Sequence, residues 1–241
     1  MNVIVIIQAR MGSSRLPGKI LKPLGSFDVL TYVVERSKKI KGVSKVIVAT
    51  SLLPQDDVVE EWCKRKDVSY FRGSETDVLS RYVEAAKEYN PEYVIRVTAD
   101  CPFVDYQLAT KMVEKKNETR CDFMSIIGDL PRGLAVELFS YHSLNYMNQH
   151  GKEQRHREHV TYYAYEFKEE FSWDTIEACE AIQQPELRIT LDTEEDYELC
   201  KKIADYYIED ILVPTEKVVK FLKENPEIAS INAHIKQKPV V

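Results

Sequence analysis

Near its N-terminus the chain reads Val3-Ile4-Val5-Ile6-Ile7-Gln8-Ala9-Arg10-Met11-Gly12-Ser13-Ser14-Arg15-Leu16-Pro17-Gly18-Lys19. The first five residues form an unbroken β-branched run, which is typical of a strand buried on both faces in a parallel sheet. Residues 46–49 and 93–97 are similar, and helical patterns that start with an acidic residue lie at 57–65 and 77–89. Strands that alternate with helices predict an α/β fold with an open, mostly parallel, Rossmann-like sheet covered on both faces.

The loop after this first strand has the composition of a phosphate-binding loop. Between Gln8 and Lys19 it holds two glycines, two serines, two arginines and a lysine. Ligands of such sheets bind at the carboxyl ends of the strands, where small residues let backbone N–H groups approach closely. This composition can cradle a triphosphate, and the alternative is a surface turn with solvated charges.

Two common phosphate-binding loops do not match this stretch. Gly12 and Gly18 have one residue too many between them for a Walker A loop, and Ile20 follows Lys19 where that loop has a serine or threonine for Mg²⁺. The GxGxxG spacing of dinucleotide-binding loops is also absent. The stretch therefore predicts a phosphate-binding loop of another type.

Two aspartates each come at the end of an apolar strand pattern. Asp100 follows the predicted strand 93–97, and Asp192 ends the pattern of residues 188–192. Taken alone, each could be a helix or turn cap. Opposite a phosphate loop, the pair predicts a Mg²⁺ site, because Mg²⁺ takes one or two carboxylates together with phosphate oxygens and waters.

The second half of the chain has a less regular pattern. Residues of about 120 to 175 predict a small insertion that shapes a second substrate site or an oligomer contact. Residues 193–207 and 215–223 have helical patterns, and residues 232–241 have the composition of a tail. We expect a nucleotidyltransferase domain over residues 1–213, followed by a C-terminal helix and tail over residues 214–241.

Composition excludes several classes of protein. The formal net charge of −6 over 241 residues argues against a general nucleic-acid binder. The five cysteines form no CxxC pair, which favours reduced thiols in a cytoplasmic protein. The sequence shows no secretion signal and no stretch of ~20 apolar residues that could cross a membrane. The basic run of residues 36–45 is typical of a solvated helix end.

The phosphate loop resembles that of a known family through Ala9-Arg10-x-x-Ser13-x-Arg15-x-Pro17-x-Lys19. This pattern is similar to the triphosphate loop of the cytidylyltransferases that make CMP-sugars, such as CMP-Kdo and CMP-sialic acid synthetases. The match is closest to the branch of the spore coat polysaccharide biosynthesis protein SpsF, where it runs almost end to end. The matching stretches include Phe71-Arg72-Gly73-Ser74-Glu75, Asp100-Cys101-Pro102, Pro131-Arg132-Gly133, Arg157-Glu158-His159-Val160 and Leu191-Asp192-Thr193.

The resemblance implies a fold of the nucleotide-diphospho-sugar transferase type. It also implies transfer of CMP from CTP to a sugar, of which an acidic one is favoured, with release of pyrophosphate, for surface polysaccharide or glycan biosynthesis. Mg²⁺ would be the cofactor, held by Asp100 and Asp192. Apart from the resemblance, we expect a homodimer that forms through the segment of residues 120–175. The implied catalytic residues are Arg10, Lys19 and Asp100. The residues expected to bind the nucleotide are Ala9, Arg10, Gly12, Ser13, Arg15, Lys19, Thr50, Arg72 and Gly73. The residues expected to bind the sugar are Arg132, Glu137, Arg157 and His159.

Two positions depart from the family pattern, and two other functions stay open. Ala99 stands where the branch usually has glycine, and Thr98 where the Kdo enzymes carry glutamine, so contacts to the base or sugar could differ. One alternative is a glycosyltransferase of the related nucleotide-sugar fold, although Asp100-Cys101-Pro102 does not supply the Asp-x-Asp motif common in such enzymes. The other is a catalytically silent nucleotide-binding subunit.

Overall fold

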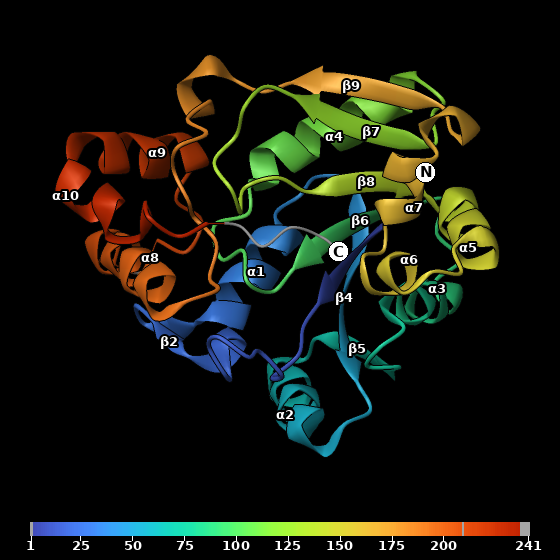
Figure 1. The fold of residues 1–241 in the computed structure, drawn as a ribbon, viewed down its shortest axis with the longest axis horizontal. Helices are drawn as coiled ribbons and strands as arrows, with labels where there is room; N and C mark the ends of the chain where they lie inside the picture. The colour runs from blue at the N-terminus through green and yellow to red at the C-terminus, as the bar shows by residue number, and fades with distance from the viewer. Residues whose placement is uncertain (1, 209, 237–241) are drawn as a thin grey trace.

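A seven-stranded sheet lies at the centre of the computed structural model, which describes residues 2–208 and 210–236 (Figure 1). Its strand order is β5-β4-β1-β6-β8-β7-β9. The strands are β1 (Val3–Gln8), β4 (Val43–Ser51), β5 (Ser69–Gly73), β6 (Tyr93–Thr98), β7 (Phe123–Ile127), β8 (Glu137–Ser140) and β9 (Trp173–Glu177). In this sheet β8 pairs antiparallel with β6 and β7, and the other pairings are parallel. The predicted α/β fold with a mostly parallel sheet is confirmed.

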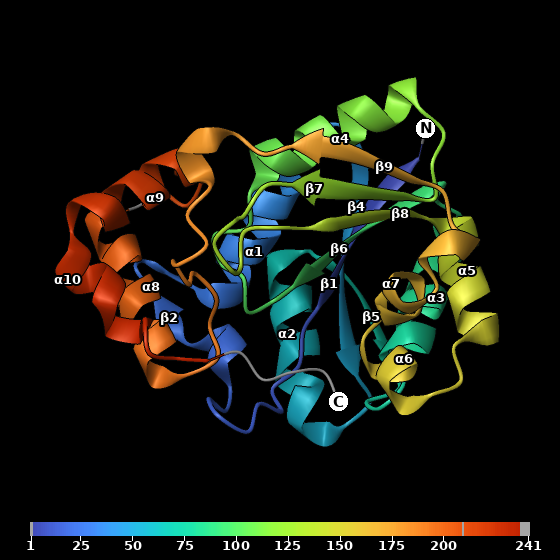
Figure 2. The ribbon, with the colours of Figure 1, turned by 45° about the horizontal axis from the view of Figure 1, so that its top comes forward.

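The central position of β1 explains its unbroken apolar run. Val3, Val5 and Ile7 join one buried cluster, while Ile4 and Ile6 join a second cluster on the opposite face. The first face is covered by α1 (Val29–Lys38), α2 (Asp57–Lys66) and α4 (Tyr106–Glu118). The second is covered by α3 (Val78–Lys87), α5 (Tyr141–His150) and α7 (Tyr162–Glu166). Figure 2 shows these two groups of helices on opposite sides of the sheet.

The segment of residues 120–175, which was expected to form a small insertion, is built into the central sheet. It supplies β7, β8 and the start of β9 to the central sheet, and α5, α6 (Gln154–Glu158) and α7 to the layer that covers it. The register of β6 and β8 places Arg96 directly opposite Glu137. This segment therefore forms one end of the sheet, with short strands whose apolar runs are too brief to be recognised in the sequence.

The C-terminal helices pack against the phosphate loop. α8 (Glu194–Tyr206), α9 (Thr215–Glu224) and α10 (Pro226–Ala229) contribute to a third apolar cluster, which also contains Leu16 and Val29. Asn232, predicted to begin a tail, is 1% exposed and donates to the carbonyl of Arg188 at 3.0 Å. The tail prediction is wrong at this residue, and residues 237–241 lie outside the described part of the chain. The shorter elements are η1 (Lys19–Leu21), β2 (Pro23–Leu24), β3 (Phe27–Asp28), η2 (Pro54–Asp56), η3 (Lys168–Glu170), η4 (Glu180–Ile182) and η5 (Ser230–Asn232).

Arg36 also departs from the expectation of a solvated helix end. Its guanidinium is buried and donates to the carbonyls of Val104 at 2.9 Å, Ile211 at 3.1 Å and Val213 at 2.8 Å. Burial lowers the pKa of Arg36 to about 10, although the nearby charge of Asp105 opposes the shift. The side chain ties α1 to the segment that connects α8 with α9.

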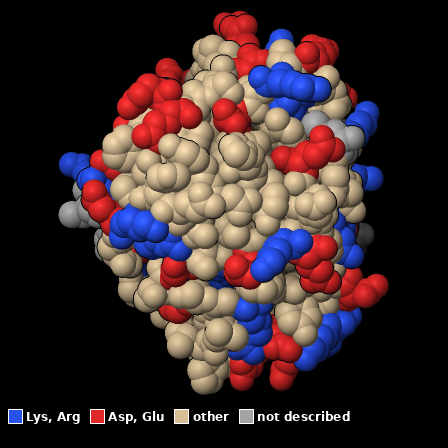
Figure 3. Space-filling view, turned by 90° about the vertical axis from the view of Figure 1, so that its right-hand side faces the viewer, with Lys and Arg blue, Asp and Glu red and all other residues tan. Residues whose placement is uncertain are grey.

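The outer surface around α5 is poor in charge. This helix contains no Lys, Arg, Asp or Glu. The corresponding face, on the right of Figure 1, shows mostly uncharged side chains at its centre (Figure 3). Within residues 2–208 and 210–236, no helix has the length and apolar character that crossing a membrane requires.

Candidate active site

The loop after β1 is held in a fixed arch around Met11. The Met11 amide donates to Oδ1 of Asp56 at 2.6 Å, and the Met11 carbonyl accepts from the amides of Ser13 at 2.9 Å and Gly18 at 3.2 Å. Gly18 has a φ of 68°, in the left-handed region that favours glycine. The chain then enters η1, and the first residue of η1, Lys19, points into a cavity beside the loop.

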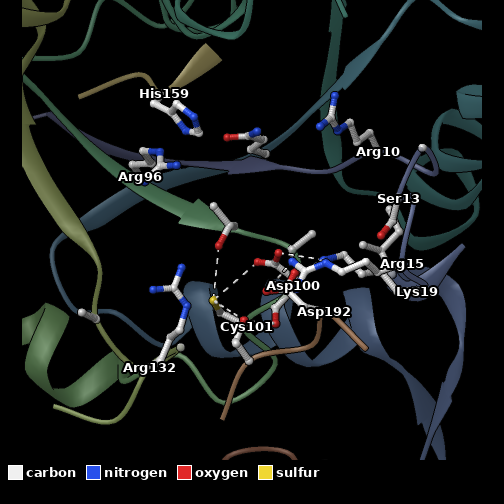
Figure 4. A pocket seen from close by; sticks show the side chains of 18 of the residues that line it. Arg10, Ser13, Arg15, Lys19, Arg96, Asp100, Cys101, Arg132, His159 and Asp192 are labelled. Atoms are coloured by element: carbon white, nitrogen blue, oxygen red, sulfur yellow. Dashed lines mark hydrogen bonds and ion pairs between the residues drawn. The ribbon is translucent and has the colours of Figure 1, made fainter. Parts of the chain in front are cut away.

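Two carboxylates meet the ammonium of Lys19 in this cavity. β6 lies parallel to β1 with Thr98 opposite Gln8, so Asp100 comes just beyond the same edge of the sheet. Nζ of Lys19 lies 2.9 Å from Oδ2 of Asp100 and 2.9 Å from Oδ1 of Asp192. Lys19 and Asp192, which are more than 170 positions apart in the sequence, thus meet in the cavity together with Asp100 (Figure 4).

Asp192 lies in a loop, although the sequence pattern predicted a strand. In residues 188–192 only Arg188 makes a β-bridge. Nη2 of Arg188 donates to Oδ2 of Asp192 at 2.9 Å, and Nε donates to Asp196 at 2.8 Å. The N-cap of α8 is Thr193, in a capping box with Asp196, so Asp192 is not that cap. Its carboxylate is directed at the cavity instead.

The charges in this cluster stabilise one another. Burial alone would raise the pKa of Asp100 and of Asp192, but the charge and hydrogen bond of Lys19 outweigh it and hold both below the ordinary value. Burial would lower the pKa of Lys19, and the two carboxylates raise it instead. All three groups are therefore ionised at neutral pH.

The donor set at this point fits Mg²⁺. Among the residues that the structure describes, no group of three or more His, Cys, Asp or Glu side chains is placed to hold a metal ion. Zinc and other metals that need a complete protein ligand set are therefore not supported there. Asp100 and Asp192 could supply the one or two carboxylates that Mg²⁺ uses when substrate phosphates complete its shell.

The cavity encloses about 850 Å³ and has two distinct ends. At one end the phosphate loop contributes Arg10, Ser13, Arg15 and Lys19 (Figure 4). At the other end lie Arg96, Arg132 and His159. A volume near the upper part of the range for small-molecule sites leaves room for a nucleotide and a second substrate side by side.

Nine of the predicted site residues line this cavity. They are Arg10, Gly12, Ser13, Arg15, Lys19, Asp100, Arg132, His159 and Asp192. Several are already engaged with carboxylates: Nη1 of Arg10 lies 2.8 Å from Glu75, and Nη2 of Arg15 lies 3.2 Å from Asp192. The phosphate end therefore presents cations that acidic side chains hold in place.

The other predicted residues lie outside the cavity. Ala9 and Thr50 are buried, and Gly73 pairs with Ser51 at the end of β5. Arg72 faces α2, where it forms ion pairs with Asp57 and Glu60 at 2.7 Å each.

Arg157 and Glu137, predicted to bind the sugar, are also turned to protein partners. Arg157 lies 2.5 Å from Asp77, the N-cap of α3. Glu137 contacts Arg96 at 2.6 Å and accepts from Thr161 at 2.9 Å. These side chains fix the walls of the cavity and do not line it.

Gln8 and Arg96 also line the cavity and were not among the predicted site residues. Gln8 is the last residue of β1, and Arg96 interrupts the apolar run of β6. A charged residue inside a buried strand is unusual, because burying a charge is costly unless it is paired. That interruption was the available signal in the sequence.

Backbone hydrogen bonds join the loops that carry the cavity's functional groups. The Arg132 amide donates to the carbonyl of Leu187 at 3.2 Å, and the Ile189 amide donates to the carbonyl of Arg132 at 2.8 Å. The Leu191 amide donates to the carbonyl of Asp100 at 2.8 Å. The loops of Asp100, Arg132 and Asp192 thus form a continuous backbone network.

Comparison with known proteins identifies relatives over the whole length. A family model described as cytidylyltransferase matches residues 4–232. The chain is 36% identical over 238 residues to the uncharacterized protein MJ1063 of Methanocaldococcus jannaschii, covering 99% of this chain and 97% of that one. It is 34% identical over 234 residues to the spore coat polysaccharide biosynthesis protein SpsF of Bacillus subtilis, covering 95% and 97%. A cytidylyltransferase structure from Leptospira borgpetersenii superimposes with a TM-score of 0.88 at 34% identity, covering 99% and 100%.

The substitution Gly133→Ala tests the network between these loops. Gly133 has a φ of 100°, and a Cβ there would lie 2.3 Å from the carbonyl oxygen of Ile189. Because that neighbour is backbone, we expect the variant to lose at least about 2 kcal/mol of unfolding free energy in urea titrations. The exposed neighbour Ala135→Ser is the control and should change stability by less than about 0.5 kcal/mol. Equal stability of the two variants would contradict the close contact.

Proposed function

Because the chain belongs to the cytidylyltransferase family, we propose that it transfers CMP from CTP to an acidic sugar and releases pyrophosphate. The observation that carries this proposal is the cluster of Lys19, Asp100 and Asp192 midway along one cavity. It joins an end rich in phosphate-binding groups to an end that can hold a second substrate. A nucleotidyl transfer needs this order of groups, since the α-phosphate must meet both the leaving pyrophosphate and the attacking hydroxyl.

The residues of the phosphate loop would bind and stabilise the leaving group. Arg10, Arg15 and Lys19 would neutralise the β- and γ-phosphates, and backbone amides near Gly12 and Ser13 would add hydrogen bonds. A sugar oxygen attacks the α-phosphorus in line, and the bond from that phosphorus to the bridging oxygen of pyrophosphate breaks. Catalysis consists mainly of positioning and charge neutralisation.

Mg²⁺, when bound, would neutralise charge on the α-phosphate and favour deprotonation of the attacking hydroxyl. Asp100 and Asp192 would hold it, since their carboxylates already converge on one cation. This role requires Lys19 to leave the carboxylates and turn toward the phosphates. A lysine side chain, a flexible stem with a compact charge, suits such an exchange.

The biological setting belongs to the same proposal. The similarity to SpsF supports a role in surface polysaccharide or glycan biosynthesis. The free cysteines Cys63, Cys101, Cys121, Cys179 and Cys200 support a reducing, cytoplasmic setting. The uncharged surface around α5 supports a homodimer through the segment of residues 120–175, because the cores of protein interfaces are depleted in charge.

Pyrophosphate release tests the proposed function directly. The protein is incubated with each of the four nucleoside triphosphates, with and without Mg²⁺, and with a panel of acidic sugars, neutral sugars and sugar phosphates. We expect release that requires CTP, Mg²⁺ and an acidic sugar. Release of a nucleotide from a nucleotide-sugar would favour a glycosyltransferase, and CTP binding without turnover on any sugar would favour a silent subunit.

Lys19→Met tests the assignment of the phosphate loop. Removing an ammonium that stabilises the leaving pyrophosphate should lower kcat/KM by at least about 100-fold. Lys22→Met is a matched control, since Lys22 pairs with Glu194 and does not line the cavity. That control should keep its activity within about twofold. Near-normal turnover of the Lys19 variant would refute the assignment.

Asp100→Asn and Asp192→Asn test the metal site. Each substitution removes a negative charge from the cation's position, so each should shift the Mg²⁺ titration of activity to at least about tenfold higher concentration. Mn²⁺ binding in the presence of CTP, followed by electron paramagnetic resonance, should weaken in parallel. Asp129→Asn, at an exposed position outside the cavity, is the control. Unchanged titrations in both site variants would leave the two aspartates a structural role only.

A further inference from the structure

The end of the cavity away from the phosphate loop has its own charged group. Arg96 projects from β6, with its side chain 22% exposed, and lines the cavity near Arg132 and His159 (Figure 4). The phosphate loop supplies three other cations at the opposite end. A triphosphate bound there leaves Arg96 and Arg132 to the second substrate.

Glu137 holds the guanidinium of Arg96 in one orientation. Nη1 of Arg96 donates to Oε2 of Glu137 at 2.6 Å, and the other oxygen of Glu137 accepts from Thr161 at 2.9 Å. Burial would lower the pKa of Arg96, but the charge of Glu137 outweighs it and raises this pKa. Nε and Nη2 of Arg96 make no hydrogen bond with any described residue. The guanidinium is therefore fixed but has donor capacity left.

Two neutral hydrogen-bonding groups line the same cavity as this arginine. Gln8 lines the cavity, and its Oε1 is buried without a hydrogen-bond partner among the described residues. Burial lowers the pKa of His159, and the charge of Arg96 lowers it further against the opposing effect of Glu158. His159 is therefore neutral at pH 7. Such groups suit the hydroxyls of a sugar.

The charges at this end match a single negative charge on the ligand. Arg96 and Arg132 each carry one positive charge, and Glu137, which pairs with Arg96, carries one negative charge. The three side chains therefore have a net charge of +1. A dianionic sugar phosphate would exceed that charge and would also face Asp100 and Asp192. A carboxylate carries one charge and fits the planar guanidinium with two parallel hydrogen bonds.

We propose that Arg96 binds the carboxylate of the sugar substrate and so selects acidic sugars, while Glu137 positions it and Gln8 accepts a hydrogen bond from a sugar hydroxyl. This inference rests on the proposed function and deepens it. Arg96 touches the substrate and determines specificity, whereas Glu137 acts through Arg96. Arg132, which is exposed, adds a second positive charge at this end of the cavity.

Matched pairs of acid and ester probe this role. The substrates are 3-deoxy-manno-octulosonate and N-acetylneuraminate, each compared with its neutral methyl ester, in the pyrophosphate assay with CTP and Mg²⁺. For the acid that is used, wild-type kcat/KM should exceed that of the ester by at least about tenfold. In Arg96→Met the KM of the acid should rise at least about tenfold, the ester should change little, and the preference should disappear.

Two further variants separate recognition from folding. Arg96→Lys keeps the charge and should recover part of the preference for the acid. Arg120→Met, at an exposed position outside the cavity, should behave as wild type. The Kd of CTP, measured by calorimetry, should stay within about twofold in every variant, since the phosphate end is intact.

Glu137→Gln tests the charge balance. Loss of this carboxylate leaves two net positive charges, so the variant should use or be inhibited by a sugar 1-phosphate better than wild type does. A purely structural role of Glu137 would lower activity with all substrates alike and would not change this ratio.

The outcomes distinguish the inference from the proposed function. If Arg96→Met keeps the wild-type preference for acid over ester, the assignment of Arg96 is refuted while nucleotidyl transfer stands. The same holds if the wild type uses neutral sugars and no acid. If no sugar supports pyrophosphate release, the proposed function fails and this inference fails with it.

Discussion

One ammonium shared by two carboxylates is the interaction around which the site is arranged. Asp100 and Asp192 come from distant parts of the chain, and their negative charges would repel each other without a cation between them. Lys19 supplies that cation at the end of the phosphate loop. The adjacent parallel strands β1 and β6 make the meeting possible, because both direct their carboxyl ends to the same edge of the sheet. The cluster thus joins the sheet, the loop and the C-terminal half.

The sequence was most informative for site residues that come directly after a strand. The buried run of β1, the loop from Gln8 to Lys19 and the position of Asp100 could be predicted, because a parallel sheet places the residues after its strands at one edge. Asp192 was predicted as a metal ligand although its residues form a loop and not a strand. The position of Asp192 depends on a backbone hydrogen bond between Leu191 and Asp100. A local sequence pattern carries no information about such a contact between distant segments.

The roles predicted less accurately from the sequence are those of residues whose hydrogen-bond or ion-pair partners are distant in the sequence. Arg72 and Arg157 look like ligand-binding arginines in the sequence, but carboxylates on α2 and at the start of α3 hold them in the protein. Arg36 looks solvated because it lies in a basic run, yet carbonyls from two distant segments surround it. An arginine's role depends on which acceptor reaches it, and that acceptor is set by tertiary contacts.

The backbone network among the loops of Asp100, Arg132 and Asp192 has a consequence for changing the substrate of such an enzyme. Arg132 donates its backbone amide to Leu187 and accepts from the amide of Ile189, with no side chain between the two segments. A loop taken from a relative would follow a different backbone path and would therefore displace Asp192. New substrate ranges are therefore more accessible through single side-chain replacements on the rigid strands, at Gln8 or Arg96, than through loop grafting. Residues on the strands can therefore change one at a time, whereas the loops of Asp100, Arg132 and Asp192 can change only together.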